Sequence, residues 1–261
     1  MDKIIIVKIG GNIIDDEIGL ASFLKKFAAV PGKKILVHGG GKLATRLAAR
    51  LSIPQVMVEG RRITDAETLK VVTMVYAGYI NKNIVALLQS SGCKAIGLSG
   101  ADGNTILAHK RVHETMDYGF AGDVDQVNHS LLQELAGKDY CPVLAPITHD
   151  GKGQLLNTNA DTIAQETAQA LGKSAEVTLI YTFEKEGVLK DVNDPASVIS
   201  QLDESSYHHY KSSGIIFEGM VPKLDNAFRA LKSGVKKVVI GKAEDLEQLI
   251  TGEKGTTIIG N

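Results

Sequence analysis

Short apolar runs alternate along this chain with longer stretches that have the periodicity of helices. The apolar runs are rich in β-branched residues and predict strands at 4–7, 35–37, 95–98, 142–145, 177–181 and 238–240. The stretches with helical periodicity lie at 20–30, 43–51, 66–88, 131–135, 161–171 and 222–231. Strand, turn and helix repeated in this order predict an α/β fold whose mostly parallel sheet is covered by helices on both faces.

Two segments depart from this alternation. Residues 101–127 carry glycines, scattered polar residues and short alternating stretches, which predict hairpins over the edge of the sheet. Near 172–175 a predicted helix is followed directly by a predicted strand. We place a boundary there between an amino-terminal lobe, residues 1–174, and a carboxy-terminal lobe, residues 175–261.

The composition is typical of a soluble enzyme with small-molecule partners. Among 261 residues, 44% are hydrophobic, 23% are charged and 27 are glycines, so the chain can bury a sizeable core between many turns. The formal net charge of −1 provides no basic field to attract nucleic acid or an anionic membrane. The first apolar run is too short for a signal peptide, and Cys93 and Cys141 are predicted to be reduced core thiols, so we expect a cytoplasmic protein.

Lysines stand beside glycines near both ends of the chain. Lys8 ends the first apolar run and precedes Gly10 and Gly11, and Lys223 follows Gly219 at the start of a helical stretch. A lysine in a hydrophobic strand would be costly unless it emerges at the strand's carboxyl end, which is where open α/β sheets bind ligands. Glycine amides and ammonium groups without an obvious nucleophile suit phosphoryl transfer, so these segments favour a kinase over a hydrolase.

Three consecutive glycines, residues 39–41, follow the strand predicted at 35–37. They fit the Gly-x-Gly-x-x-Ala form of a dinucleotide fingerprint, and Glu59 falls about 20 residues further on, where that fingerprint places an acid. The strand predicted at 56–58 is very short for that fold, and a run of amides before a helix suits a carboxylate or a single phosphate at least as well. A dinucleotide-binding protein stays an alternative, as does a glycine turn needed only for packing. His38 is predicted to be a hydrogen-bonded turn residue rather than a base.

Polar residues at two further junctions can bind an anionic acceptor. One of Arg61 and Arg62 can hold a carboxylate through two parallel hydrogen bonds, while the other is expected at the surface. At the next junction, Asn159 or Asp161 can simply cap a helix, or Asn157 can bind substrate while Asp161 holds neighbouring lysines. A carboxylate acceptor needs no proton removed, so the absence of a clear base is compatible with formation of an acyl phosphate.

Five short motifs occur in a fixed order: Lys8-Ile9-Gly10-Gly11, His38-Gly39-Gly40-Gly41, Gly60-Arg61-Arg62-Ile63-Thr64, Asn157-Thr158-Asn159-Ala160-Asp161 and Gly219-Met220-Val221-Pro222-Lys223. Together they resemble the N-acetyl-L-glutamate kinases of the amino acid kinase superfamily, over essentially the whole chain. The resemblance implies an open αβα sandwich with two lobes. It implies an amino-terminal lobe that binds the acylated amino acid and forms a homodimer, and a carboxy-terminal lobe that binds ATP with Mg²⁺. The γ-carboxylate of N-acetyl-L-glutamate would be phosphorylated by ATP, a step of arginine biosynthesis.

The resemblance also assigns roles by motif position. Lys8 and Lys223 would stabilise charge on the phosphoryl group in transfer, and Asp161 would orient both lysines. Four residues would bind the acylated amino acid: Gly40, Gly41, Arg62 and Asn157. Five residues would bind ATP: Gly10, Gly11, Thr182, Gly187 and Gly219. No residue of the chain is assigned to a metal.

Two features depart from the family pattern. Relatives usually carry a Thr-Asp-Val-type segment shortly before Gly-Val-Leu, whereas this chain has Phe183 in place of the acid and one extra residue before Gly187. Arginine-inhibited relatives typically have a helix ahead of the first strand, for which Lys8 leaves no room. We therefore expect no hexameric ring and weak or absent inhibition by arginine.

Two further alternatives stay open. One is the same chemistry on N-succinyl-L-glutamate or on another carboxylate or carbamate, and the other is a non-catalytic amino-acid sensor with the same fold. A larger acyl group such as succinyl would need room, and could use a cation, near residues 101–127. The retention of both lysines and of Asp161 argues against the sensor.

Overall fold

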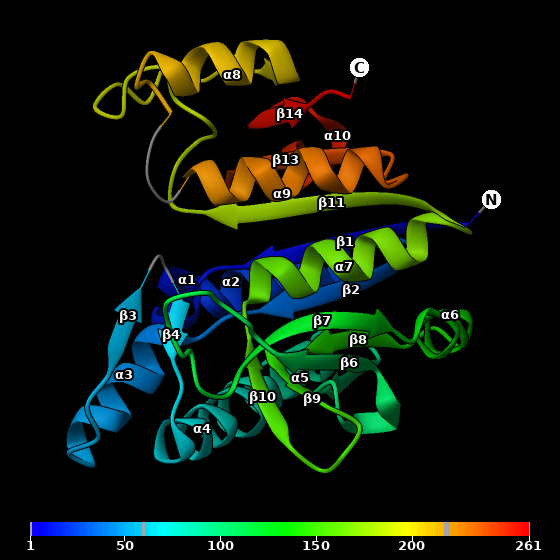
Figure 1. The fold of residues 1–261 in the computed structure, drawn as a ribbon. Helices are drawn as coiled ribbons and strands as arrows, with labels where there is room; N and C mark the ends of the chain where they lie inside the picture. Colours follow the sequence, from blue (N-terminus) through cyan, green and yellow to red (C-terminus); the bar gives the residue numbers. More distant parts are fainter. Residues whose placement is uncertain (1, 59–60, 217–219, 261) are drawn as a thin grey trace.

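An eight-stranded sheet forms the centre of the computed structural model, which describes residues 2–58, 61–216 and 220–260 (Figure 1). The strand order is β12-β14-β13-β11-β1-β2-β8-β5. The strands are β1 Lys3–Ile9, β2 Lys33–His38, β5 Ala95–Leu98, β8 Cys141–Leu144, β11 Glu176–Phe183, β12 Gln201–Leu202, β13 Lys237–Lys242 and β14 Thr256–Ile258. All neighbours pair in parallel except β13 and β14, so the predicted mostly parallel sheet is confirmed.

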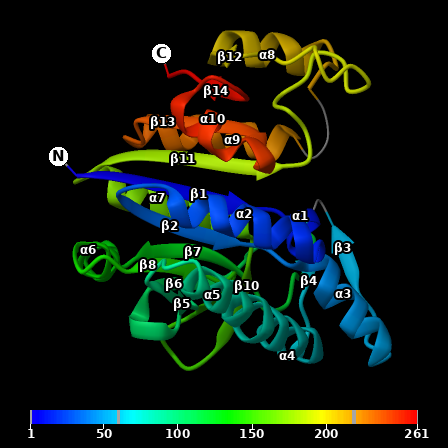
Figure 2. The same ribbon diagram turned by 180° about the vertical axis from the view of Figure 1, so that it is seen from behind.

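Helices cover both faces of this sheet, which confirms the expected αβα sandwich. One face packs against α6 His129–Gly137, α7 Ala160–Gly172, α8 Glu204–Ser212 and α9 Met220–Lys232. The other packs against α1 Gly11–Asp15, α2 Glu17–Ala29, α3 Gly41–Arg50, α4 Ala66–Thr73, α5 Asn81–Ser90 and α10 Leu246–Thr251. Helices α7 and α9 lie in front of the sheet in Figure 1, and α2 and α10 lie in front in the reverse view of Figure 2. The sheet runs without a break from β1 to β11, across the lobe boundary expected at 174 and 175.

The alternation of side chains along β1 decides which layer each one reaches. Ile4 and Ile6 belong to the core cluster that contains α7, and Val7 and Ile9 belong to the cluster on the opposite face. Because successive residues of a strand point to opposite faces, Lys8 lies on the α7 face. Lys8 is also the last residue but one of β1, so it stands close to the strand's carboxyl end as predicted.

One long helix spans Ala66–Ser90, close to the predicted 66–88. It consists of α4, a π-helical stretch η1 (Met74–Ile80) and α5. Its length and hydropathy alone would allow it to cross a membrane, a test that core helices of soluble proteins also pass. Here Val71, Val72, Ile84 and Leu88 are buried in the core cluster on the α2 face.

Smaller elements complete the fold. The hairpin predicted within 101–127 is present as β6 Ile106–Lys110 and β7 Ala121–Val127, which form a closed four-stranded sheet with β9 Ile147–His149 and β10 Leu155–Thr158. Two short 3₁₀ helices are η2 Asp102–Asn104 and η3 Ala243–Asp245. Cys93 and Cys141 are buried free thiols, as predicted.

The strand predicted at 56–58 is β3 Val56–Val58, and it pairs in antiparallel fashion with β4 Arg61–Ile63. A dinucleotide fingerprint would place this strand in parallel beside the strand that precedes the glycines. In this fold β2 lies between β1 and β8 instead. Glu59, the acid of that alternative, and Gly60 lie outside the described residues.

Candidate active site

The glycine motifs meet at the carboxyl ends of the three central strands. In the sheet register Lys8 is opposite Tyr181, and Ile9 is opposite both Thr182 and His38. The hydroxyl of Thr182 donates a hydrogen bond to the Lys8 carbonyl at 3.1 Å. Gly10, Gly11, residues 39–41 and Thr182 therefore lie at one edge, where open parallel sheets bind ligands.

Lys8, Asp161 and Lys223 form one ion-paired group, which we call the lysine cluster. Lys8 Nζ lies 2.6 Å from Asp161 Oδ1, and Lys223 Nζ donates to Asp161 Oδ2 at 2.5 Å. Lys8 comes from β1, Asp161 from the first turn of α7 and Lys223 from the first turn of α9. The structure thus brings together three residues that are more than 200 positions apart at their extremes in the sequence.

Burial and charge act against each other in the lysine cluster. Burial opposes ionisation of Asp161, but Lys8 and Lys223 outweigh it and hold the pKa of this carboxyl well below its usual range. Burial also lowers the pKa of Lys8, while Asp161 opposes that shift. Both lysines form ion pairs with the one Asp161 carboxylate, so the three side chains carry a formal net charge of +1.

The start of α7 is built so that Asp161 faces the lysines. Asn159 Oδ1 accepts hydrogen bonds from the backbone N–H groups of Asp161 at 2.8 Å and Thr162 at 3.2 Å. Of the two candidate caps, Asn159 is therefore the one in use, which leaves the Asp161 carboxylate to the lysines. The Tyr181 hydroxyl donates to the Asp161 carbonyl at 3.3 Å and ties α7 to β11.

A cavity of ≈ 170 Å³ lies beside the three-glycine loop, and we call it the acceptor cavity. All four residues expected to bind the acylated amino acid line it, namely Gly40, Gly41, Arg62 and Asn157. The Arg62 guanidinium is buried and fixed: it donates to Gln55 Oε1, to the Gly41 carbonyl at 3.1 Å and to Thr45 Oγ1 at 3.0 Å. Asn157 Nδ2 donates to Thr64 Oγ1 at 3.0 Å.

Gly40 is required by the shape of this loop. Its φ of +147° is a conformation that L side chains rarely adopt, and an added Cβ would lie 2.3 Å from Ile80 Cδ1. The loop therefore packs against η1 through bare backbone. This close approach leaves the amides at the start of α3 next to the acceptor cavity.

His38 is hydrogen-bonded, as predicted, but it is the last residue of β2 rather than a turn residue. Its Nδ1 lies 2.8 Å from the Gly39 carbonyl, and Asn81 Nδ2 lies 3.1 Å from its Nε2. With Nδ1–H as the donor and Nε2 as the acceptor, the neutral ring satisfies both contacts. Burial lowers the pKa of His38 to about 4, so the ring is neutral at pH 7.

Four of the five residues expected to bind ATP are described by the structure. Gly10, Gly11 and Thr182 lie together next to Lys8. Gly187 packs against β14, where an added Cβ would lie 2.8 Å from Thr256 Oγ1, and its role in nucleotide binding stays a prediction. Gly219 lies outside the described residues.

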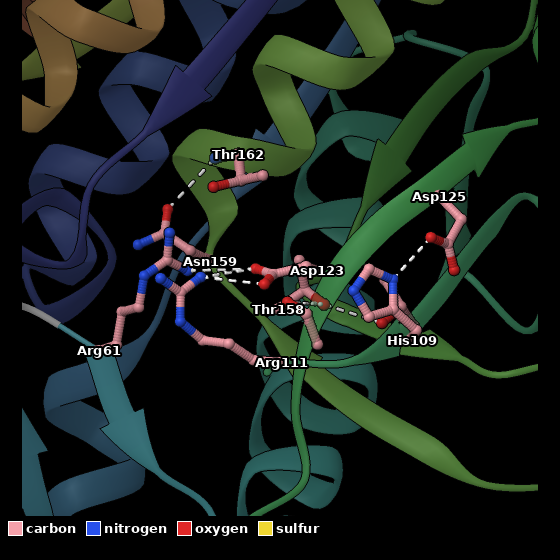
Figure 3. A network of polar contacts seen from close by, with 10 residues as sticks. Arg61, His109, Arg111, Asp123, Asp125, Thr158, Asn159 and Thr162 are labelled. Carbon is pink, nitrogen blue, oxygen red and sulfur yellow. Dashed lines mark hydrogen bonds and ion pairs between the residues drawn. The ribbon is translucent and has the colours of Figure 1, made fainter. Parts of the chain in front are cut away.

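Sequence reasoning missed a second ion-paired group, which we call the arginine cluster. Arg111 Nη1 donates to both carboxylate oxygens of Asp123, at 2.8 and 3.0 Å, and Arg61 Nη1 lies 3.9 Å from Asp123 Oδ1 (Figure 3). Arg61 was expected either to hold a carboxylate or to lie at the surface. Arg111 and Asp123 lie across the β6–β7 hairpin, a pairing that the alternating pattern of 101–127 could have suggested had its register been known.

A departure from the family pattern also has a structural counterpart. Glu184 follows Phe183, and its Oε2 accepts a hydrogen bond from Asn12 Nδ2 at 2.8 Å. Its charge also acts to raise the pKa of Lys8. Glu184, one position after Phe183, therefore places an acid near Asn12 and Lys8, and no pattern in the sequence predicted this contact.

Comparison with known proteins assigns the chain to a family. The model of the amino acid kinase family matches residues 3–242. The chain belongs to the amino acid kinase family. The acetylglutamate kinase of Cytophaga hutchinsonii is 54% identical over 100% of both chains, and that of Parabacteroides distasonis is 54% identical over 99% of this chain and 100% of its own. The resemblance to the acetylglutamate kinases is confirmed.

A solved structure with a similar fold supports the architecture of this amino acid kinase family member. The protein smu.665 from Streptococcus mutans has a TM-score of 0.81 and 26% identity, with 98% of each chain covered. The open αβα sandwich expected from the motifs is confirmed.

Proposed function

We propose that this chain is an ATP-dependent acetylglutamate kinase, which phosphorylates the γ-carboxylate of N-acetyl-L-glutamate in arginine biosynthesis. The observation that carries the proposal is the lysine cluster, in which the buried Lys8 and the half-buried Lys223 are held by one carboxylate at the carboxyl edge of the sheet. The relatives with 54% identity over the whole chain support the same activity. A dinucleotide-binding protein has no comparable support.

The acceptor cavity provides contacts for an acylated amino acid. Arg62, already oriented by three hydrogen-bond acceptors, would bind the α-carboxylate, and the amides of Gly40 and Gly41 would face the substrate. Asn157 would donate its side-chain amide to the substrate. These contacts fix the position of the γ-carboxylate, and positioning is the main catalytic requirement of phosphoryl transfer.

The transfer itself needs no base from the protein. An oxygen of the ionised γ-carboxylate attacks the γ-phosphorus of ATP while the bond from that phosphorus to the β,γ-bridging oxygen breaks. The products are an acyl phosphate and ADP. Lys8 and Lys223 stabilise the negative charge on the phosphoryl oxygens in transfer, and Asp161 holds the two lysines in place.

Residues 175–261 and the end of β1 would bind the nucleotide, with Gly10, Gly11 and Thr182 beside the phosphates. The Asp161 carboxylate is a poor ligand for a metal in this arrangement, because both of its oxygens are paired with lysines. Mg²⁺ would therefore enter with ATP, bound by its phosphates, and supply further neutralisation of phosphate charge.

Residues 1–174 would also provide the contact of a homodimer. Large apolar side chains are exposed on this lobe directly after α3, on β3 and on η1: Leu51, Val56, Met57, Met74 and Tyr79. Exposed apolar groups of this size favour an interface over a solvated surface. Light scattering should give the mass of two chains, and the mass of one chain at micromolar concentration would contradict the dimer.

Trapping of the product tests the proposed activity. The purified protein is incubated with magnesium-ATP, hydroxylamine and N-acetyl-L-glutamate, with L-glutamate and L-aspartate as acceptors that lack the acyl group. The proposal expects an acyl hydroxamate from the acylated acceptor and little from the two free amino acids. If no acyl hydroxamate forms from any acylated glutamate, the proposal is overturned.

A further inference from the structure

Tyr76 lines the acceptor cavity but belongs to none of the motifs that contain the cavity's other polar residues. It lies on η1, the π-helical part of the long helix, and its side chain is 5% exposed. Met74 and Tyr79 of the same stretch are more than half exposed, so η1 directs these two side chains to solvent and Tyr76 inward. Departures from α-helical geometry of this kind are frequent at functional sites.

The Tyr76 ring packs against the three-glycine loop. A Cβ added at Gly40 would lie 3.2 Å from Tyr76 Cδ1 and 3.3 Å from Tyr76 Cε1. One edge of the ring therefore contacts bare backbone, and this contact restricts where the ring can lie. Phenylalanine has the same ring, so the packing does not depend on the Tyr76 hydroxyl.

The same loop brings Tyr76 close to Arg62. A Cβ added at Gly41 would lie 3.7 Å from Arg62 Nη2, so two successive glycines contact the Tyr76 ring and the Arg62 guanidinium. Burial raises the pKa of Tyr76, and the charge of the nearby Arg62 opposes that shift. The Tyr76 hydroxyl therefore keeps its proton at pH 7 and can donate a hydrogen bond beside the guanidinium.

The hydrogen bonds of Arg62 leave room for a second donor to the same anion. A guanidinium has five N–H donors, and three of those of Arg62 are used by Gln55, Gly41 and Thr45, so two remain for a ligand. An ionised carboxylate offers about four acceptor positions on its two oxygens. Two guanidinium donors alone do not fill these positions.

We infer that Tyr76 is a binding residue for the acceptor and that its hydroxyl donates a hydrogen bond to the α-carboxylate held by Arg62. The inference rests on the proposed function and adds one donor to its substrate site. Hydrogen bonds to a charged acceptor are stronger than those between neutral groups. The Tyr76 hydroxyl therefore favours acceptors whose α-carboxylate is ionised.

Tyr76→Phe removes the hydroxyl and retains the ring that packs on Gly40. KM for N-acetyl-L-glutamate should rise roughly 10- to 100-fold, while kcat stays within about threefold. Tyr140→Phe is the matched control, because Tyr140 precedes β8 at the amino end of that strand, away from the acceptor cavity, and it should change neither constant. An unchanged KM in Tyr76→Phe would overturn the inference.

A second acceptor distinguishes recognition of the carboxylate from general damage to the cavity. The α-amide of N-acetyl-L-glutamate keeps the acyl group and the γ-carboxylate but presents a neutral group to Tyr76 and Arg62. The loss of kcat/KM caused by Tyr76→Phe should be at least about threefold smaller for this amide than for N-acetyl-L-glutamate. Equal losses for both acceptors would show that the substitution disturbs the loop and that the hydroxyl does not bind the carboxylate.

The failures of the two proposals differ. If the unmodified protein phosphorylates no acylated glutamate, the kinase function fails. If the unmodified protein phosphorylates N-acetyl-L-glutamate and Tyr76→Phe has the same KM for it, the kinase function stands and the assignment of Tyr76 to the α-carboxylate fails.

Discussion

The lysine cluster and the arginine cluster have the same composition of charge in different surroundings. Each has two cationic side chains around one carboxylate and a net charge of +1. The lysine cluster has short contacts of 2.6 and 2.5 Å, and its side chains are 11–24% exposed. The Asp123 and Arg61 side chains of the arginine cluster are 30% and 28% exposed, and their ion pair is 3.9 Å long. In the proposed function the first group acts on the transferred phosphoryl group, and the contrast in burial predicts that the two groups differ in their effects on turnover and stability.

The largest expected effect is on turnover. Lys8→Ala and Lys223→Ala should each lower kcat by roughly 10²- to 10³-fold, because each removes a preorganised charge that stabilises the transition state. Steady-state kinetics with saturating ATP and acceptor measure this. Lys173→Ala, on an exposed lysine at the end of α7, is the matched control. Turnover within about threefold of normal in both variants would remove the lysine cluster from the mechanism.

The next prediction compares how much each cluster contributes to the stability of the protein. Asp161→Asn leaves the buried Lys8 and the half-buried Lys223 without their carboxylate and should lower the free energy of unfolding by roughly 3 kcal/mol. Asp123→Asn acts on a more exposed group and should lower it by less than about 1 kcal/mol. Urea unfolding of both variants at pH 7 gives the two values. Equal losses would mean that the difference in burial has no energetic consequence.

Arg62, which lines the acceptor cavity, should affect binding of the acceptor rather than turnover. Arg62→Lys keeps the charge but loses the planar fork that contacts Gln55, Gly41 and Thr45. We expect KM for the acylated glutamate to rise roughly tenfold and kcat to stay within about threefold. A large fall in kcat with an unchanged KM would assign Arg62 to the transition state instead.

The smallest effect concerns the pH dependence of stability near the glycine loop. The pKa of His38 is about 4 in the folded protein, below its ordinary value of 6.5, so the unfolded chain binds more protons between these values. The contribution of neutral His38 to stability is complete above pH 6.5 and is lost progressively as the pH falls toward 4. Between pH 7.5 and pH 5.5 this group should account for a loss of about 1 kcal/mol.

His38→Asn provides the comparison for that measurement, because all other titrating groups are retained. The fall in the free energy of unfolding between the two pH values should be smaller in the variant by about 1 kcal/mol. An identical fall in both proteins would show that His38 does not resist protonation.

The fold was largely predictable because its core follows simple periodicities. The six strands and six helical stretches of the predicted alternation are all present, and so is the short strand at 56–58, since buried β-branched runs and amphipathic helices leave clear patterns. The short strands β4, β9, β10, β12 and β14 and the helices α1, α8 and α10 were not predicted. Segments of two to nine residues such as these depend on tertiary pairing more than on their own pattern.

The lysine cluster was predictable and the arginine cluster was not, for a physical reason. Lys8 and Asp161 stand at strand and helix ends, and parallel α/β topology brings such ends to one edge. Arg111 and Asp123 meet only through the register of the β6–β7 hairpin, which contains an irregularity between Leu107 and Ala108. A shift of one residue would have sent either side chain to the opposite face.

The most direct test of the central claim follows the transferred phosphoryl group. N-acyl-L-glutamate labelled with ¹⁸O in its γ-carboxylate is incubated with magnesium-ATP and the protein, and the products are observed by ³¹P NMR. Attack by the carboxylate predicts an acyl-phosphate resonance that carries the isotope shift of a bridging ¹⁸O, together with ADP. Formation of ADP without a labelled acyl phosphate, or no reaction of any acylated glutamate, would contradict the account.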